Sequence, residues 1–262
     1  ASGKHKFAAK LKKAKRPMII IGMGALARAD GAAVLGQSRD IAETYGVVTK
    51  TWNGFNILHS AASRVAGLDM GFVPEKSGLD VEAMCKAAEA GKLDLVWLLG
   101  ADEADLPRLK NAFIVYQGHH GDNGAHHADV VLPGAAYTEK DGIYLNTEGR
   151  VQYANRAAFP PGEAREDWAI LRAFAGVMKI NFGFDSLDEL RELLFRAVPH
   201  FADRDMISPT KWVKFGSRAK VKPVKFTTAI DNFYMTCAIS RASETMAECM
   251  RANGTDRAEA AE

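Results

Sequence analysis

Four of the chain's seven histidines lie within nine residues of the stretch YQGHHGDNGAHHADVVLPG (116–134), namely His119, His120, His126 and His127. Imidazoles ligate transition metals and serve as general bases. A metal would need further ligands, and Asp122 and Asp129 are the nearest carboxylates. The spacing matches no zinc motif. Adjacent histidines in an extended chain point apart, so at most one of each pair would reach a given metal.

Three glycines accompany these histidines: Gly118 precedes them, and Gly121 and Gly124 lie between the two pairs. Glycines at this density indicate a loop that is shaped by the demands of its backbone. No G-x-S-x-G element or comparable nucleophile motif accompanies the imidazoles. The residue pattern therefore favours a structural loop over a metal site or a catalytic loop.

Two further patterns bear on redox and nucleotide chemistry. Cys85, Cys237 and Cys249 are far apart without a C-x-x-C pair, so they cannot assemble a zinc knuckle or an iron–sulfur cluster locally. Three scattered thiols fit a reducing compartment. GMGALA (22–27) is similar to a dinucleotide fingerprint, but the next predicted strand ends in TKTW (49–52), without an acid for the ribose. A tight strand-to-helix turn without a ligand is favoured.

A polar set follows the last predicted strand, on the turns of ADVVLPGAAYTEKDGIYLNTEGRVQ (128–152). It consists of Glu139, Asn146, Glu148 and Arg150. One interpretation is a loop framework that is held by Glu–Arg pairs and by bonds from Asn to the backbone. The other is a pocket for a phosphate-bearing cofactor. Spacing alone leaves both open.

The elements that must position these residues form an alternating pattern. Short apolar runs predict strands at 17–22, 47–52, 93–100, 112–118 and 128–134, and helical periodicity predicts helices at 33–46, 56–68, 81–92, 165–180, 186–198 and 240–252. Ser186 and Glu189 predict a capping box. Turn residues at 137–164 indicate loops and hairpin pieces. The fold class is therefore α/β, a doubly wound, mostly parallel sheet with helices on both faces.

Composition is that of an ordinary globular protein, with 47% hydrophobic and 25% charged residues and a net charge of +2. This total predicts no global field for nucleic acid or anionic lipid, and no apolar run approaches the ~20 residues of a membrane-spanning helix. We expect a basic N-terminal segment (1–15), the α/β domain (16–198) and an irregular extension that ends in a helix (199–262). Trp212, Phe215 and Phe226, interleaved with lysines, suit a mixed apolar and charged partner interface.

The stretch 128–152 resembles the C-terminal part of molybdopterin-dependent oxidoreductases, where ADVVLP, an E-K-x-G turn and N-x-E-G-R-x-Q follow one another. Longer blocks extend the resemblance, including RPMIIIGMGALARADGAAVL, VYQGHHGDNGAHHADVVLPG, PPGEAREDWAILRAFA and IDNFYMTCAISRASETMAECM. Together they resemble the large iron–sulfur subunit (75 kDa type) of respiratory complex I, the NADH–ubiquinone oxidoreductase, in its mitochondrial and alphaproteobacterial form. The similarity runs from about residue 14 to about residue 252.

This resemblance implies a non-catalytic scaffold, a molybdopterin-oxidoreductase-like domain without its cofactor, in the hydrophilic arm on the matrix side of the mitochondrial inner membrane. It would support electron transfer from NADH to ubiquinone. No catalytic, cofactor-binding or metal-binding residue is then expected on this chain, and the iron–sulfur clusters are expected on a missing or separate N-terminal half. The implied partners are other hydrophilic-arm subunits, including a cysteine-rich iron–sulfur protein, with no nucleic acid and no direct membrane span. A first residue of Ala rather than Met allows a cleaved leader and would suit a split gene, and the alternative is a partial chain that starts midway through a longer protein.

The resemblance also bears on the histidines. GHHGD matches the family's own loop at His119 and His120, whereas His126 and His127 fall where the family usually has small or apolar residues. Loop packing and hydrogen bonding are the expected roles of all four. The alternative is a working enzyme that binds a molybdopterin dinucleotide near Gly118 and Gly134. Against it stand the lack of a Cys or Ser placed as a metal ligand and of the upstream half of the cofactor cleft.

Overall fold

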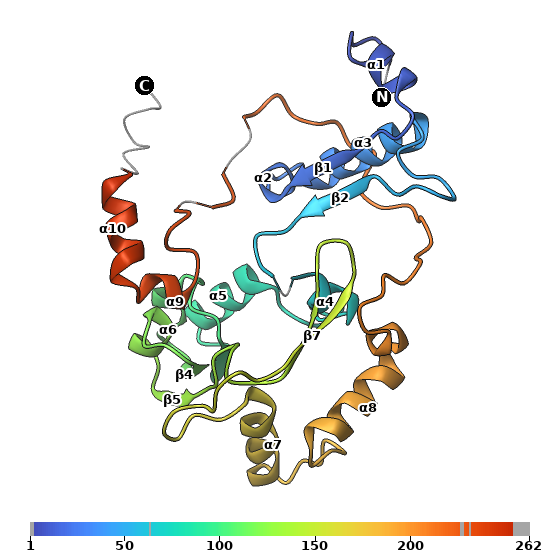
Figure 1. Ribbon diagram of the computed structural model, residues 1–262. Coiled ribbons are helices and arrows are strands. Elements are labelled where there is room, and N and C mark those ends of the chain that lie inside the picture. Colours follow the sequence, from blue (N-terminus) through green and yellow to red (C-terminus); the bar gives the residue numbers. More distant parts are fainter. Residues whose placement is uncertain (1–2, 63, 226–227, 231, 254–262) are drawn as a thin grey trace. The chain divides into compact units, whose positions relative to one another are not determined.

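The computed structural model describes residues 3–62, 64–225, 228–230 and 232–253. The chain forms two compact units, each assembled from stretches that are far apart in sequence (Figure 1). Unit 1 comprises Ala1–Ala66, Tyr144–Val151 and Asp205–Asp231, and unit 2 comprises Gly67–Ile143, Gln152–Arg204 and Asn232–Glu262. Domain boundaries after residues 15 and 198 stay a prediction, because compactness does not show which segments fold independently.

The two units carry opposite charge. Unit 1 contains 18 Lys and Arg against six Asp and Glu, whereas unit 2 contains 16 against 26. Their formal net charges are therefore +12 and −10. The small net charge of the whole chain conceals this separation, and the weak field predicted from the total does not hold for unit 1 taken by itself.

Unit 1 is built on a parallel pair of strands. In chain order its first elements are α1 (Ala8–Lys13), β1 (Ile19–Gly22), α2 (Met23–Leu26), α3 (Gly31–Thr44) and β2 (Phe55–Leu58). Ile19 lies opposite Phe55, and Gly22 lies opposite Leu58. The strand predicted at 17–22, the tight strand-to-helix turn after it and the helix predicted at 33–46 are confirmed.

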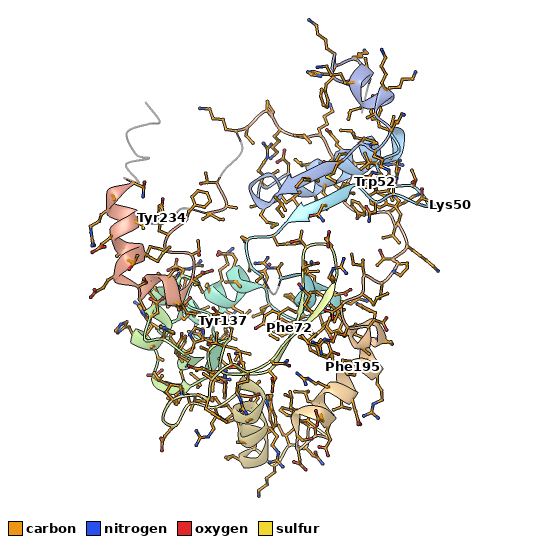
Figure 2. All side chains as sticks on the ribbon, in the orientation of Figure 1. Lys50, Trp52, Phe72, Tyr137, Phe195 and Tyr234 are labelled. Carbon is orange, nitrogen blue, oxygen red and sulfur yellow. The ribbon has the colours of Figure 1, made fainter. Side chains whose placement is uncertain are left out.

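The second strand of unit 1 lies later than predicted. Residues 47–52 form most of a turn in which the Thr49 N–H donates to the Trp52 carbonyl at 2.7 Å, and Val48 pairs with Asn53 only as an isolated bridge. Figure 2 shows Lys50 and Trp52 on this turn. The helix predicted at 56–68 is wrong in its first half, since β2 occupies that place and α4 begins only at Arg64 (Arg64–Asp69). The end of β2 carries His59 rather than an acid.

The tail of unit 1 packs against α3 and β2. The rings of Trp212 and Phe215 lie 5.2 and 5.4 Å from the ring of Phe55. The Trp212 indole N–H donates to Glu43 at 3.0 Å, and Arg39 donates to the Phe215 carbonyl at 2.6 Å. Both rings are half-buried and pack within the chain, and their role in a partner interface stays a prediction. Phe226, the third ring of that prediction, lies outside the described residues.

A buried ion pair fixes the tail farther along. The Asp30 carboxylate accepts from Nε and Nη2 of Arg28, both at 2.8 Å, and from the Lys222 N–H at 2.6 Å. Arg28 also donates to the carbonyls of Lys222 and Val224. The Arg28 guanidinium, followed by the Lys222 N–H, holds the pKa of Asp30 well below its usual range. Asp30 therefore joins the start of α3 to residue 222.

Replacing Asp30 with Asn is expected to make trypsin cleave after Lys220 several-fold faster, because the amide provides neither the charge nor the second acceptor oxygen for Arg28. Mass spectrometry of a digestion time course measures this. Asp94→Asn, at an exposed residue before a strand of unit 2, is the matched control and should leave the rates unchanged. Equal cleavage of the Asp30→Asn and control variants would show that the ion pair does not hold the tail.

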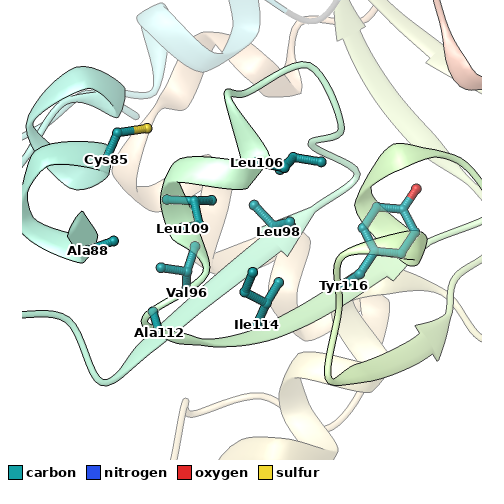
Figure 3. Close-up of a cluster of buried hydrophobic side chains, with 9 residues drawn as sticks. All are labelled: Cys85, Ala88, Val96, Leu98, Leu106, Leu109, Ala112, Ile114 and Tyr116. Atoms are coloured by element: carbon teal, nitrogen blue, oxygen red, sulfur yellow. The ribbon is translucent and has the colours of Figure 1, made fainter. Parts of the chain in front are cut away.

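Unit 2 contains a three-stranded parallel sheet in the order β3 (Leu95–Leu99), β4 (Phe113–Gly118), β5 (Val130–Pro133). Side chains of β3 and β4 pack on α5 (Val81–Glu89) and η1 (Leu106–Leu109), as Figure 3 shows. The buried members of this core are Cys85, Ala88, Val96, Leu98, Leu106, Leu109, Ala112, Ile114 and Tyr116. The three predicted strands and the helix predicted at 81–92 are confirmed, and the short α6 (Asn123–His126) adds to them.

The remaining elements follow the sheet in sequence. β6 (Gly142–Leu145) and β7 (Val151–Ala154) pair as a two-stranded sheet, and α7 (Asp167–Val177), α8 (Leu187–Ala197) and η2 (Pro199–Ala202) come after it. The capping box of Ser186 and Glu189 is confirmed on α8. The final predicted helix is two helices, α9 (Ala238–Arg241) and α10 (Glu244–Ala252), because Ser243 caps the second with its side chain.

Helices lie on both faces of the three-stranded sheet. α5 covers one face, and α7 reaches the other, where Phe174 contacts Trp97 with ring centroids 4.8 Å apart. The α/β class with parallel strands is therefore confirmed, although the parallel strands form a separate sheet in each unit. Within the described residues, no helix is both long enough and apolar enough to cross a membrane.

Candidate functional site

The carboxyl ends of β3, β4 and β5 meet at one edge of the sheet in unit 2, which is where α/β sheets usually bind ligands. Three segments leave the sheet there. Asp102 follows β3, the GHHGD loop with His119 and His120 follows β4, and Gly134 follows β5. This carboxyl edge is the candidate functional site.

The histidines divide into two pairs with different surroundings. The Nδ1 atoms of His119 and His120 lie 2.6 Å apart, and the rings meet edge to face. The expectation that these neighbours point apart is wrong, because residues 119 and 120 form a bend rather than extended chain. His126 and His127 are exposed at the end of α6, where His127 Nδ1 lies 2.9 Å from the Asn123 carbonyl oxygen.

The electrostatic surroundings of the first pair do not favour a cation. Although His119 is exposed overall, partial burial of its ring, and then repulsion from His120 and Lys140, lowers its pKa. The two carboxylates considered as further ligands have other partners. Asp129 accepts from the Ile114 N–H at 2.7 Å, and Asp122 pairs with Arg241. No group of three or more potential metal ligands occurs among the residues that the structure describes.

The centre of the edge is an ion-pair cluster that we call the Arg241 cluster: Arg241, Asp102 and Asp122. Arg241 Nε donates to Asp122 at 2.5 Å. Nη2 lies 2.8 Å from Asp102 Oδ1, but outside hydrogen-bond geometry, so that contact is an ion pair. The Asp102 side chain is 7% exposed, that of Asp122 16% and that of Arg241 23%. The end of α9 thus inserts its guanidinium between residues that follow β3 and β4.

Asp122 illustrates the balance of forces in the Arg241 cluster. Its burial alone would raise the carboxyl pKa, but the hydrogen bonds from Arg241 and from the Asn123 N–H outweigh that effect and lower it. The carboxylate is therefore held in its charged form by groups of the chain itself.

A second polar cluster joins the sheet to α7. Gln117, fully buried on β4, donates to Asp167 Oδ1 at 2.9 Å and accepts from the Trp97 indole N–H at 3.2 Å. Lys140 forms an ion pair with the other oxygen of Asp167. This cluster binds the first turn of α7 to the sheet, and the charge of Lys140 is paired with Asp167 within it.

The polar set on the later turns has structural partners. Glu139 accepts from the Ala136 N–H at 2.9 Å, and Asn146 Oδ1 accepts from the N–H groups of Glu148 and Arg150. Arg150 donates to the Asp205 carbonyl at 2.7 Å and lies 3.7 Å from Glu148. Of the two open interpretations, these contacts favour the loop framework over a phosphate pocket.

The family implied by the motifs would bring an anionic pterin nucleotide to this carboxyl edge. Pyrophosphates bind to available cations and to free backbone N–H groups. Arg241 and Lys140 are both paired with carboxylates, and Asp102 and Asp122 add negative charge to the same place. The residues present therefore do not fit such a cofactor.

Arg241 and Asp102 did not stand out in the sequence. Arg241 lies 119 residues from Asp122, and neither arginine nor aspartate belongs to a spaced motif here. The only available signal was the long final block IDNFYMTCAISRASETMAECM, which contains Arg241 but does not indicate its partners.

Family comparisons add to this geometry. The family model described as molybdopterin oxidoreductase matches residues 1–177, and a model for the C-terminal part of the G-type subunit of NADH-ubiquinone oxidoreductase matches residues 207–249. The first match contains the sheet of unit 2, and the second contains Arg241.

Individual relatives cover nearly the whole chain. The G-type subunit of NADH-quinone oxidoreductase from Rickettsia felis is 46% identical over 252 residues, which are 96% of this chain and 36% of the relative. The 75 kDa subunit of NADH-ubiquinone oxidoreductase from Reclinomonas americana is 41% identical, and the mitochondrial iron-sulfur protein 1 of NADH dehydrogenase (ubiquinone) from Solanum tuberosum is 42% identical, each over 95% of this chain. The chain spans about a third of the length of these curated relatives.

Proposed function

The chain belongs to the molybdopterin oxidoreductase family, and we propose that it is a non-catalytic scaffold in an NADH:quinone oxidoreductase, where it corresponds to the C-terminal part of the large iron–sulfur subunit. In that role it supports electron transfer from NADH to ubiquinone without supplying a catalytic, cofactor-binding or metal-binding residue. Relatives that carry the names of these subunits align with nearly all of the chain.

One observation carries the proposal of a scaffold. The carboxyl edge, where a sheet of this class would take a ligand, holds the chain's own Arg241 between Asp102 and Asp122. A structural ion pair in that place stabilises the packing of α9 on the sheet and occupies the guanidinium of Arg241, which a pterin nucleotide would otherwise find there. The family's cofactor chemistry is thereby replaced by intramolecular packing.

Iron–sulfur clusters belong, in this proposal, to the part of the subunit that the chain does not span. A cluster of the common Cys₄ type needs four thiolates, and this chain has three cysteines, of which Cys85 is buried, Cys237 exposed and Cys249 half-buried. The remaining part comes from a separate cysteine-rich polypeptide or from the same gene product, and other subunits of the hydrophilic arm surround it. The complex lies at the mitochondrial inner membrane, on the matrix side.

Native gel separation of an organelle extract, followed by mass-spectrometric profiling of each slice, tests the proposal. We expect this chain to migrate at high mass, together with other NADH oxidoreductase subunits and with peptides that align with the upstream two thirds of its relatives. If those peptides come from a separate polypeptide, the gene is split. Migration as a small free species would contradict the scaffold.

The rival function, a domain that binds a molybdopterin cofactor, predicts a different composition. Molybdenum or tungsten and a pterin, stoichiometric with the purified chain, would establish it and overturn the scaffold proposal. We expect instead that purified samples contain iron only when the upstream peptides are also present.

A further inference from the structure

We infer that the open edge of β3 in unit 2 docks a β-strand, with its crossover helix, from the part of the large subunit that this chain does not span. This inference rests on the proposed function and assigns the docking surface within it. The surface, which we call the β3 surface, consists of Leu95, Leu99 and Phe113 on the strands and Val177 on α7.

The register of the sheet defines which side chains share a face. Side chains alternate along each strand, and partners in a parallel ladder point to the same side. Val96 and Leu98 lie on the face that α5 covers. Leu95 and Leu99 therefore lie on the opposite face with Trp97, and Phe113 joins them because it pairs with Leu95.

This second face is covered only in part. The Phe174 ring of α7 covers Trp97, and the first turn of α7 binds Gln117. Leu95, Leu99 and Phe113 remain 47%, 46% and 47% exposed. Parallel sheets are normally covered on both faces, because their strands are apolar on both sides. Three large apolar side chains, exposed on one face of the sheet on the edge strand and its neighbour, therefore indicate a missing layer.

α7 extends the exposed apolar surface. Val177 and Met178 lie three and four residues after Phe174, on the same side of the helix, and are 78% and 55% exposed. A helix laid beside α7 would cover these residues together with Leu95 and Phe113. A crossover helix is what connects neighbouring strands of a parallel sheet.

The edge itself selects β3 rather than β5. Within the described residues β3 pairs only with β4, so its outer side is an open edge. At β5 the chain returns, and Arg165 bridges Gly134 and exchanges backbone hydrogen bonds with Pro133 and Ala135. An unpaired edge with apolar neighbours accepts a further strand through backbone hydrogen bonds.

The occupant follows from the length of the relatives. This chain spans 36% of the Rickettsia felis protein and 33% of the Solanum tuberosum protein, so about two thirds of each has no counterpart here. In a subunit of that length, the same polypeptide can supply the layer that covers the β3 surface. This favours the upstream part of the subunit as the occupant over a second copy of this chain.

Two variants test the surface in the native complex. Leu95→Asp/Leu99→Asp should lower the recovery of the upstream polypeptide with the affinity-tagged chain by about tenfold, because two charges would be buried in an apolar contact. Val81→Asp is the matched control, since it is an exposed apolar residue on α5, which covers the other face. Circular dichroism and the melting temperature of the free chain show whether each variant folds.

A photo-crosslinker at position 99 gives an independent readout that needs no destabilising charge. We expect cross-linked peptides that align with the upstream two thirds of the relatives. Cross-links to a second copy of this chain or to any other subunit, while the chain still migrates with the NADH oxidoreductase, would overturn the docking site and leave the proposed function standing. Absence from that complex would overturn both.

Discussion

Replacing Arg241 with Met is expected to lower the free energy of unfolding of the chain by about 3 kcal/mol, the lower end of the range for breaking a buried ion pair. The lower end applies because the Asp122 side chain is 16% exposed and that of Arg241 23%. Met has similar volume, so the loss comes from two carboxylates that face each other without a countercharge. Urea unfolding measures the change, and hydrogen exchange should show α9 and α10 losing protection first.

A variant without charges in the Arg241 cluster tests whether the loss of stability comes from unpaired carboxylates rather than from the change of side chain itself. The triple variant Arg241→Met/Asp102→Asn/Asp122→Asn should recover at least half of the lost stability, because no unpaired charge remains. Arg251→Met, at an exposed arginine in the last turn of α10, is the control and should change stability by less than about 0.5 kcal/mol. If the triple variant is no more stable than the single one, the charges of the Arg241 cluster are not the cause.

The same cluster predicts a pH dependence. The pKa of Asp122 is lowered in the folded chain, so its contribution to stability is complete above the ordinary carboxyl pKa of about 4 and declines as the pH falls below it. In Arg241→Met the unpaired carboxylates would instead gain from protonation. The stability difference between the two proteins should therefore be largest near neutral pH and narrow toward pH 4. A constant difference across that range would contradict the ionic origin.

Local apolar patterns predicted much of the fold. The runs that became β3 and β4 are continuous, bounded by turn residues, and buried in one core, so local pattern and packing agree. The prediction for residues 47–58 was wrong. The β-branched VVTKTW (47–52) has the stronger strand propensity, but it is the short FNIL (55–58) that pairs with β1. Pairing with β1 decides this choice, and a sequence window does not contain it.

Long-range assembly could not be predicted at all. Unit 1 joins three stretches, and its charge of +12 becomes apparent only after they are grouped. The packing of Trp212 and Phe215 on Phe55 was not predicted, because Phe55 is far from both of them in sequence. The structural role of the histidine loop stays a prediction. Its glycines were expected to meet backbone demands, but neither Gly118 nor Gly124 has a positive φ, and both instead lie against a neighbouring aromatic ring.

That ring belongs to Tyr116, and replacing it with Ala should lower the free energy of unfolding by about 3 kcal/mol. Tyr116 is 2% exposed and packs in the core of unit 2. A Cβ added at Gly124 would come within 2.4 Å of the ring, and one at Gly118 within 2.3 Å of the phenol oxygen. The two glycines therefore make the space in which the ring sits.

Gly124→Ala is correspondingly expected to lower the free energy of unfolding by about 1–3 kcal/mol, because the core behind the ring prevents it from moving away. In Tyr116→Ala/Gly124→Ala the new methyl group enters the vacated space, so the double variant should be more stable than the sum of the single effects by about 1 kcal/mol. Gly121→Ala is the matched control in the same loop, since a Cβ there meets nothing within 4 Å. Urea unfolding of the four variants measures the coupling, and additive effects would show that the histidine loop does not depend on the ring beneath it.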